Sequence, residues 1–472
     1  MPENWTGRLT SGMDRRTFVK ACGGAAFALA DGRFANSGFA ARSSSPPNIL
    51  LIMTDQQAID TIAAVGCSYV KTPAMDRIKK RGVSFVRSYC ANSVCSPSRA
   101  AILTGRAASE TGVWKNSEHI RFDIPNMGEW FSQQAGYETV YAGKWHLPSG
   151  YSHFIPGFRV LHTGISGVGN VGDTAVSRAC EGFLRNRSSS KPFLMVASLM
   201  QPHDICEWYR LNKIPPSRLP YQELADELPP LPDNFEVTTP EPEELKRRRE
   251  GWEPYEGKWD KQHWRYYLWS YYRHVEMVDG EIGRLLQALE ETELDKSTLI
   301  VFTSDHGEGM AQHQLARKQT AYEASARVPL MVSWPRHVLE DHTDTTHLVT
   351  GMDIMPTVCE YAQIATPPNM RGQSLKPLLE GKSVPWRSHI VTEIPKNVGR
   401  MVRTERYKYV TYLNDPVEQL FDMDEDPGET VNLAAGSRHA SILNEHKKLL
   451  KGWESQLDIA ANVPNPDAWR ST

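Results

Sequence analysis

Two largely apolar segments, each ending on an aspartate, constrain the fold of this chain more than any other feature. Residues 48–54 precede Asp55, and residues 297–304 precede Asp305. Because neither segment alternates polar with apolar side chains along its centre, each is predicted to be a strand buried on both faces, as in a parallel sheet. Further short strands are predicted at residues 83–85, 138–142 and 192–199.

Helical patterns lie between these strands, at residues 73–80, 97–103 and 263–291. Glycines at 82 and 105 are expected to stop the first two helices. Strands that alternate with helices are typical of α/β proteins. We therefore predict a large mixed, mostly parallel sheet sandwiched by helices.

The pattern changes beyond about residue 380. Residues 401–404 and 407–412 read as the two strands of an antiparallel hairpin, and residues 441–457 as a closing helix. A length of 472 residues accommodates one large domain and a small partner. We expect the first at residues 47–380 and a smaller C-terminal α+β subdomain with an antiparallel sheet at residues 381–472.

The charge balance excludes one class of protein, and the length of the apolar stretches excludes another. Lys and Arg number 53 against 56 Asp and Glu, a net charge of -3, whereas proteins that neutralise nucleic-acid phosphates normally carry a basic excess. The basic run Lys246–Arg249 is surrounded by glutamates, so we interpret it as a solvated helix face. No apolar stretch reaches the length of a transmembrane span. The sequence thus predicts neither nucleic-acid binding nor a membrane-spanning segment.

The first 41 residues resemble an export signal. Arg15 and Arg16 precede a weakly apolar stretch at residues 21–30, and small residues follow near Ala40. This order is typical of a twin-arginine signal, which predicts passage through the twin-arginine translocon to the periplasm or beyond. The 7 cysteines include no CxxC pair and are sparse for a disulfide scaffold. Since twin-arginine substrates cross the membrane folded, these thiols would meet cytoplasmic enzymes first.

Residues 206–260 differ in character from the rest of the chain. They are rich in proline, and we interpret them as a long, irregular insertion of the kind that often carries function. Five tryptophans lie in or just beyond it: Trp208, Trp252, Trp259, Trp264 and Trp269. Their aromatic faces could stack on sugar rings, or they could pack the insertion onto the main domain.

Polar residues follow the two central strands directly, as Asp55-Gln56 and Asp305-His306. Ligands of open α/β sheets bind at the carboxyl ends of the strands, where two converging carboxylates would be costly without a cation. Mainly oxygen ligands with one imidazole suit Ca²⁺ or Mg²⁺, and Mn²⁺ through the histidine. An aspartate at a strand end, taken alone, also commonly caps a helix.

A third segment, residues 95–105, supplies a candidate nucleophile. Cys95 precedes the predicted helix start, where free N–H groups and the helix dipole favour an anion. Arg99 lies one turn later on the same face. A tetrahedral anion beside Cys95 would meet a helix N-terminus, a guanidinium and a metal ion, which is what sulfuryl or phosphoryl transfer requires.

This segment resembles the sulfatase signature, C-x-P-S-R followed by L-T-G. Residues 136–146 and 304–308, Lys318 with Tyr322-Glu323, and residues 420–427 match further motifs of that family in the same order. The chain is thereby identified as resembling a type I sulfatase of the alkaline-phosphatase superfamily over residues 47–435. The resemblance implies an alkaline-phosphatase-like fold and hydrolysis of sulfuric esters.

The resemblance also implies a modified residue. In this family the signature cysteine, here Cys95, is oxidised to Cα-formylglycine by a formylglycine-generating maturase that acts on the unfolded chain. One hydroxyl of the hydrated aldehyde attacks sulfur, and the second is later deprotonated to expel sulfate. One divalent metal ion, expected to be Ca²⁺, would be held by Asp55, Gln56, residue 95, Asp305 and His306.

The remaining functional residues follow from the same motifs. Arg99 would orient the diol, Lys144 would bind the diol or the sulfate, and His146 would be the base for the second hydroxyl. His203 and Lys318 would contact the sulfate and its bridging oxygen, so either could be the general acid.

Two positions depart from the commonest family pattern, Gln56 in place of a second aspartate and His306 in place of asparagine. The departures resemble some sugar sulfatases and the related phosphonate monoester hydrolases. A neutral Gln56 should weaken Ca²⁺ binding. Export favours a sulfated carbohydrate as substrate. The alternatives are a phosphonate monoester or phosphodiester hydrolase that uses the same site, and an inactive homologue that binds sulfated glycans.

Overall fold

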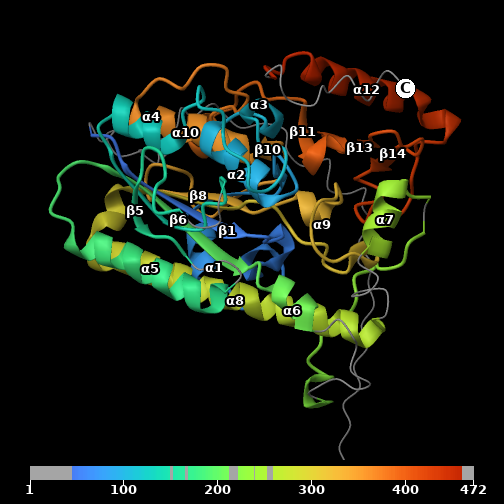
Figure 1. The fold of residues 1–472 in the computed structure, drawn as a ribbon, viewed down its shortest axis with the longest axis horizontal. Coiled ribbons are helices and arrows are strands. Elements are labelled where there is room, and N and C mark those ends of the chain that lie inside the picture. The colour runs from blue at the N-terminus through green and yellow to red at the C-terminus, as the bar shows by residue number, and fades with distance from the viewer. Residues whose placement is uncertain are drawn as a thin grey trace, which may run out of the picture. The chain divides into compact units, whose positions relative to one another are not determined.

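An eight-stranded sheet carries the candidate site, in the order β5-β4-β6-β1-β7-β8-β2-β9 (Figure 1). Its strands are β1 Asn48–Asp55, β2 Gly82–Phe85, β4 Glu138–Gly143, β5 Arg159–His162, β6 Phe193–Pro202, β7 Thr298–Ser304, β8 Leu330–Ser333 and β9 His342–Asp344. The central strands β4, β6, β1 and β7 are parallel, whereas β8 runs antiparallel to both β7 and β2. The predicted mixed, mostly parallel sheet is confirmed.

This computed structural model describes residues 45–148, 152–164, 168–211, 222–238, 240–251 and 259–459. The predicted export signal lies outside the described residues, as does Trp252. Residues 41–472 group into one compact unit. The described helices are α1 Pro73–Lys80, α2 Cys95–Thr104, α3 Ala108–Thr111, α4 Met127–Gln134, α5 Gly169–Asn186, α6 Ile205–Leu211, α7 Glu243–Gly251, α8 Lys261–Glu291, α9 Glu323–Ala326, α10 Ile354–Ala362, α11 Lys376–Leu379 and α12 Ala440–Glu454.

Helices cover both faces of the sheet, which explains why residues 49–53 of β1 are all apolar. Leu50 and Ile52 pack in one core cluster with α1, α5 and α8. Ile49 and Leu51 point the other way, into a second cluster with α2, α4 and α10. Successive side chains of a strand alternate between its faces, so a strand between two helical layers needs apolar residues at every position. Figure 1 shows the two layers on opposite sides of the sheet.

Helix α2 begins at Cys95, two residues earlier than the sequence predicts. Pro97 is the reason for the difference, because a proline suggests a helix start, yet the first turn of a helix tolerates a residue without an N–H. Val94 precedes the helix in an extended conformation, and Gly105 ends it in a left-handed conformation with φ 68°. Cys95 is therefore the first residue of the helix, and its side chain is fully buried.

The region 206–260 is less irregular than the sequence predicts, since it contains most of α6 and all of α7. The interpretation of Lys246–Arg249 as a solvated helix face is only partly right. Arg249 pairs with Glu241 at 2.7 Å and donates to the carbonyl of His313 at 3.0 Å. The side chain of Arg248 is only 14% exposed. Helix α7 is thus tied to the domain through its basic residues.

The C-terminal part forms a separate antiparallel sheet of four strands, as predicted. Its strands are β11 His389–Ile394, β12 Gly399–Thr404, β13 Tyr407–Tyr412 and β14 Gln419–Asp422. A small parallel pair, β3 Ser88–Tyr89 with β10 Val349–Thr350, lies apart from both sheets. Glu393 of β11 also bonds to the segment just before Cys95, donating to the Ala91 carbonyl at 2.8 Å and accepting from the Ser93 N–H at 3.2 Å. The C-terminal sheet thereby helps to hold the start of α2.

A buried lysine anchors the C-terminal sheet, and its removal gives a stability prediction. Lys408 of β13 lies 3.0 Å from Glu323 and 2.7 Å from Glu429, and all three residues are buried. Lys408→Met leaves the buried Glu429 without its cation and leaves Glu323 with Arg327 as its ion-pair partner, so urea denaturation should show the free energy of unfolding reduced by about 3–5 kcal/mol. Lys447→Met removes a partly exposed ion pair with Glu418 and should cost less than about 1 kcal/mol. Equal effects would contradict the anchoring of the sheet by Lys408.

None of the helices in the described part of the chain is both long enough and apolar enough to span a bilayer.

Candidate active site

Four predicted site residues converge at the carboxyl ends of β1 and β7. Thr54 pairs with Ser304 in the parallel register, which places Asp55 beside Asp305. Helix α2 brings Cys95 to the same point. Ligand atoms of Asp55, Cys95, Asp305 and His306 all lie within 4.8 Å of one another, and all four residues are buried. The predicted convergence of the strand ends is therefore confirmed.

Arg99 lies between the two carboxylates. Its Nη2 donates to Asp55 Oδ2 and its Nε to Asp305 Oδ2, both at 2.8 Å. Its Nη1 donates to the Lys144 carbonyl at 2.9 Å and to Ser198 Oγ at 2.7 Å. These contacts use most of the guanidinium donors and show Arg99 as the buried counter-charge of both aspartates. That Arg99 also orients a diol stays a prediction.

Lysine and histidine side chains surround the Cys95 thiol. Lys318 Nζ lies 3.3 Å from Cys95 Sγ, and His306 Nε2 lies 3.2 Å from it. Lys144 Nζ donates to Asp55 Oδ2 at 2.6 Å, and Asp55 Oδ1 lies 3.9 Å from the thiol. Lys318 thus contacts the nucleophile, and Lys144 contacts the neighbouring carboxylate of Asp55.

The ionisation of these groups shows how positive the pocket is. Burial and the charge of Asp55 act to raise the pKa of the Cys95 thiol, but Lys144, Lys318 and His306 outweigh them and hold it well below its usual range. Burial also opposes ionisation of Asp55, yet Lys144, His203 and Arg99 hold the pKa of its carboxyl well below the ordinary value. The pocket therefore stabilises negative charge at position 95.

The two other predicted histidines lie at the edge of this cluster. His203 Nε2 is 4.0 Å from Asp55 Oδ1, and burial, with Lys318 and Lys144, holds the pKa of His203 well below its usual value. His146 has a left-handed backbone with φ 64°, and its carbonyl accepts from Ser96 Oγ at 2.6 Å. The Nδ1 atoms of both rings are buried without a hydrogen-bond partner among the described residues. Neither Nδ1 is therefore tied to another of the described residues.

The donor set fits a hard divalent cation. Asp55 Oδ2 is occupied by Arg99 and Lys144, whereas Oδ1 faces the thiol with only distant contacts. His306 Nδ1 contacts the Gly307 carbonyl at 2.9 Å, which places the ring proton on Nδ1. The lone pair of Nε2 is then free to bind a metal ion. Two carboxylates and an imidazole, with the Gln56 amide oxygen nearby, could hold Ca²⁺, Mg²⁺ or Mn²⁺.

Several residues of the site have no signature in the sequence. Asn116 Oδ1 accepts from the Ser96 N–H at 3.0 Å, at the start of α2. Ser198 of β6 accepts from Arg99, as described above. The thiol of Cys206 contacts the Gln56 amide at 3.6 Å. Glu308 ends a recognised motif, but nothing in its sequence context assigns it a partner. Each contact joins segments far apart in the chain, which local patterns do not encode.

The tryptophans of residues 206–269 that the structure describes mainly pack. Trp259 lies 5.2 Å from Trp208 and 5.0 Å from Trp264, ring centre to ring centre, with edge-on geometry. Trp259 and Trp264 are buried. Trp269 instead stacks on Tyr266 at 5.9 Å. Of the two uses left open by the sequence, packing is the one that Trp259 and Trp264 serve.

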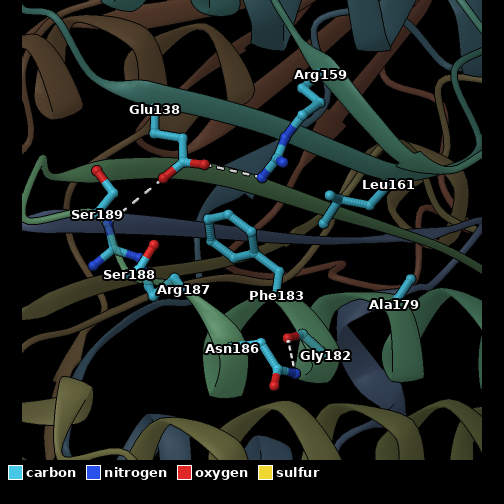
Figure 2. Close-up of a pocket in the computed structure, with 10 residues that line it drawn as sticks. All are labelled: Glu138, Arg159, Leu161, Ala179, Gly182, Phe183, Asn186, Arg187, Ser188 and Ser189. Atoms are coloured by element: carbon cyan, nitrogen blue, oxygen red, sulfur yellow. Dashed lines mark hydrogen bonds and ion pairs between the residues drawn. The ribbon is translucent and has the colours of Figure 1, made fainter.

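A pocket of about 410 Å³ lies elsewhere, at the start of β4 and the end of α5 (Figure 2). Glu138 pairs there with Arg159 at 2.9 Å and with Arg187 at 3.7 Å, beside the ring of Phe183. Because Glu138 begins β4 while Lys144 follows its end, this pocket opens at the opposite end of the strand from the candidate site.

Comparison with known proteins identifies the family. The family model for sulfatases matches residues 47–364, and the model for the C-terminal part of N-sulphoglucosamine sulphohydrolase matches residues 311–456. A Delta 4,5-hexuronate-2-O-sulfatase of Bacteroides thetaiotaomicron is 32% identical over 443 residues, which cover 88% of this chain and 90% of the relative.

Solved structures agree with this relation. A 2-O GAG sulfatase superposes with a TM-score of 0.80 at 28% identity, over 90% of this chain and 96% of that one. A phosphonate monoester hydrolase of Agrobacterium radiobacter reaches a TM-score of 0.71 at 22% identity, over 87% of this chain and 96% of that one, and shows a shared fold alone. The chain belongs to the sulfatase family, as a type I sulfatase of the alkaline-phosphatase superfamily, and is an enzyme that hydrolyses sulfate esters.

Proposed function

We propose that this sulfatase releases inorganic sulfate from a sulfated carbohydrate, with residue 95 acting as Cα-formylglycine beside one divalent metal ion, Ca²⁺ by preference. The observation that carries the proposal is the position of Cys95, buried among Lys318, His306 and Asp55. The relatives support the substrate class, since the Bacteroides thetaiotaomicron enzyme acts on a hexuronate sulfate. A maturase that supplies the oxidant would convert the thiol to the aldehyde.

The chain's own groups account for both halves of the reaction. One hydroxyl of the hydrated aldehyde, which would lie where the Cys95 thiol lies, attacks sulfur and forms a sulfate ester of residue 95. The carbohydrate alcohol leaves with a proton from Lys318 or His203, of which Lys318 is the group that the pocket keeps protonated, because the pKa of His203 is held well below its usual value. His146 then takes the proton of the second hydroxyl, the bond between the side chain and the sulfate oxygen breaks, and the aldehyde reforms.

The metal ion would be held by Asp55, Gln56, residue 95, Asp305 and His306. When bound, it supplies positive charge that favours an ionised diol and neutralises the sulfate oxygens. Lys144 and Lys318 add charge from the protein side, at 2.6 Å from Asp55 and 3.3 Å from the thiol. Arg99 donates to both aspartates at 2.8 Å and holds them in place.

Relative rates on model esters test the proposal against the alternatives. A 4-nitrophenyl sulfate, the matching phenyl phosphonate monoester and a phosphodiester should be compared by kcat/KM, with Cys95→Ala as the background control. The proposal expects a clear preference for the sulfate, followed by turnover of sulfated sugars. Similar kcat/KM on all three esters would favour the phosphonate or phosphodiester hydrolase, and glycan binding without turnover would favour an inactive homologue.

His146→Ala should separate the two half-reactions. Without a base for the second hydroxyl, the sulfate ester of residue 95 should accumulate, and kcat should fall about 10²–10⁴-fold. The measurement is an intact mass spectrum after mixing with excess substrate, together with a stoichiometric burst of released alcohol. His153→Ala, a histidine outside the cluster, serves as the matched control. A spectrum without the sulfate adduct would assign the base to another residue.

The predicted organisation of the precursor completes the proposal. Residues 1–41 would direct the folded enzyme through the twin-arginine translocon to the periplasm or the outside, after the maturase has acted on the unfolded chain. Residues 47–380 would form the catalytic domain, with the insertion at residues 206–260, and residues 381–472 the C-terminal subdomain. Comparison of the N-terminus of the exported protein with that of the precursor would test the signal.

A further inference from the structure

We propose that Glu308 is a positioning residue that fixes the side-chain amide of Gln56 with its oxygen directed to the metal site. The inference rests on the proposed metal ion, since its purpose is to make a neutral side chain a reliable metal ligand. Glu308 touches neither the nucleophile nor the other ligands in the contacts described above. It acts through Gln56.

The contacts of Glu308 are those of a carboxylate that accepts from every side. It is fully buried. Its Oε1 accepts from the hydroxyls of Tyr209 at 2.6 Å and Tyr267 at 2.7 Å, and from the backbone N–H of Arg317. Its Oε2 accepts from Nε2 of Gln56. In all four contacts the partner donates and an oxygen of Glu308 accepts.

Two independent contacts give the Gln56 amide the same orientation. A carboxylate accepts and does not donate, so the amide atom facing Glu308 must be the nitrogen. An ammonium donates and does not accept, so the amide atom that lies 2.5 Å from Lys318 Nζ must be the oxygen. Lys318 Nζ in turn lies 3.3 Å from Cys95 Sγ, so Gln56 Oε1 faces the nucleophile and the metal donors.

This orientation decides whether Gln56 can bind a cation at all. An amide turned by 180° would present two N–H donors to the metal, whereas either oxygen of an aspartate would serve equally well. A glutamine at this position therefore needs a hydrogen-bond acceptor for its amide nitrogen, and Glu308 is that acceptor. Position 56 thus lacks the carboxylate that an aspartate would supply. The carboxylate of Glu308 instead holds the Gln56 amide by a hydrogen bond.

Buried aromatic side chains surround the carboxylate of Glu308. Tyr209 of α6 and Tyr267 of α8 are fully buried, with ring centres 5.7 Å apart. Trp259 packs against both, at 6.2 Å and 6.0 Å. The aromatic residues around α6 and α8 thus enclose the carboxylate, and hydrogen bonds to it are stronger in such a medium than in water. The guanidinium of Arg317 lies 4.8 Å from the Tyr209 ring centre, which also ties down the segment that carries Lys318.

Calcium affinity of the metal-free protein tests the proposal. Glu308→Gln keeps the shape of the side chain but can donate as well as accept, so it no longer enforces the Gln56 orientation. Isothermal titration with Ca²⁺ should show about 10–100-fold weaker binding than wild type. Tyr267→Phe is the matched control, because it removes one bond to Glu308 and leaves the bond to Gln56; its affinity should fall less than about threefold.

An exchange of the two side chains makes the test sharper. In the double variant Gln56→Glu with Glu308→Gln, the new amide at position 308 can donate to the new carboxylate at position 56. The Ca²⁺ affinity should then return to the wild-type value or above it. Glu308→Gln with unchanged Ca²⁺ affinity and only a lower melting temperature would overturn the proposal. An exchange variant that binds no more tightly than Glu308→Gln would overturn it too. A wild-type protein that binds no Ca²⁺, Mg²⁺ or Mn²⁺ would instead overturn the proposed metal ion.

Discussion

Cys95→Ala should lower kcat for sulfate-ester hydrolysis by about 10⁴–10⁶-fold, which is the range seen when an enzyme loses its nucleophile. Its thiol is the atom on which Lys318, His306 and Asp55 converge. Alanine suits the first turn of a helix, so the fold should persist. Initial rates on an aryl sulfate, with circular dichroism as the check on folding, give the result.

Cys180→Ala is the control for this variant. Cys180 is a buried thiol in the core formed by α5 and α8, and it belongs to none of the family motifs. It should lose stability by about 1–3 kcal/mol and keep its kcat. Substantial turnover by Cys95→Ala would remove the proposed mechanism, because that mechanism places the attacking hydroxyl on residue 95.

Exhaustive chelation should have the second-largest effect. Asp55 and Asp305 are both fully buried, and their ligand atoms lie within 4.8 Å of those of Cys95 and His306, an arrangement that a divalent cation fits. Treatment with EDTA followed by dialysis should lower kcat by at least about 10³-fold, since the charge of a metal ion contributes several kcal/mol to such transition states. The melting temperature should fall as well, because the metal binds the folded state only.

Re-addition of single ions then identifies the metal. Ca²⁺ should restore the activity and the melting temperature together, with Mg²⁺ and Mn²⁺ compared at the same concentration. His306 could favour Mn²⁺, since imidazole suits softer ions than an all-oxygen site does. Full activity after complete removal of divalent ions would show that Arg99, Lys144 and Lys318 alone provide the positive charge.

The sequence predicts the elements that carry the site because their patterns are local. The segment at residues 48–54 is apolar at every position that the two helical layers cover, and the structure makes it β1. The start of α2 differs from the prediction, since Pro97 suggests a later start than the first turn of a helix requires. Residues 206–260 are more helical than a proline-rich insertion suggests, because α6 precedes the prolines of residues 215–242 and α7 follows them; of the two, the sequence indicates only a helix face at Lys246–Arg249.

The site itself divides in the same way. Asp55 and Asp305 could be placed together because parallel strands end at the same edge of a sheet. The bond between Glu308 and Gln56 could not be predicted, because the two residues are 252 positions apart and their meeting depends on the orientation of one amide. Tyr209 and Tyr267 likewise reach Glu308 from separate helices. Such contacts depend on packing, which no single segment specifies.

The most direct test of the nucleophile is a peptide mass spectrum across position 95 of the active enzyme, purified from its own host. The thiol of Cys95 should be replaced by the aldehyde of Cα-formylglycine, detectable as a hydrazone after reaction with a hydrazine probe. An unmodified cysteine in a fully active protein would contradict the proposed nucleophile. The site would then have to work with a thiolate nucleophile.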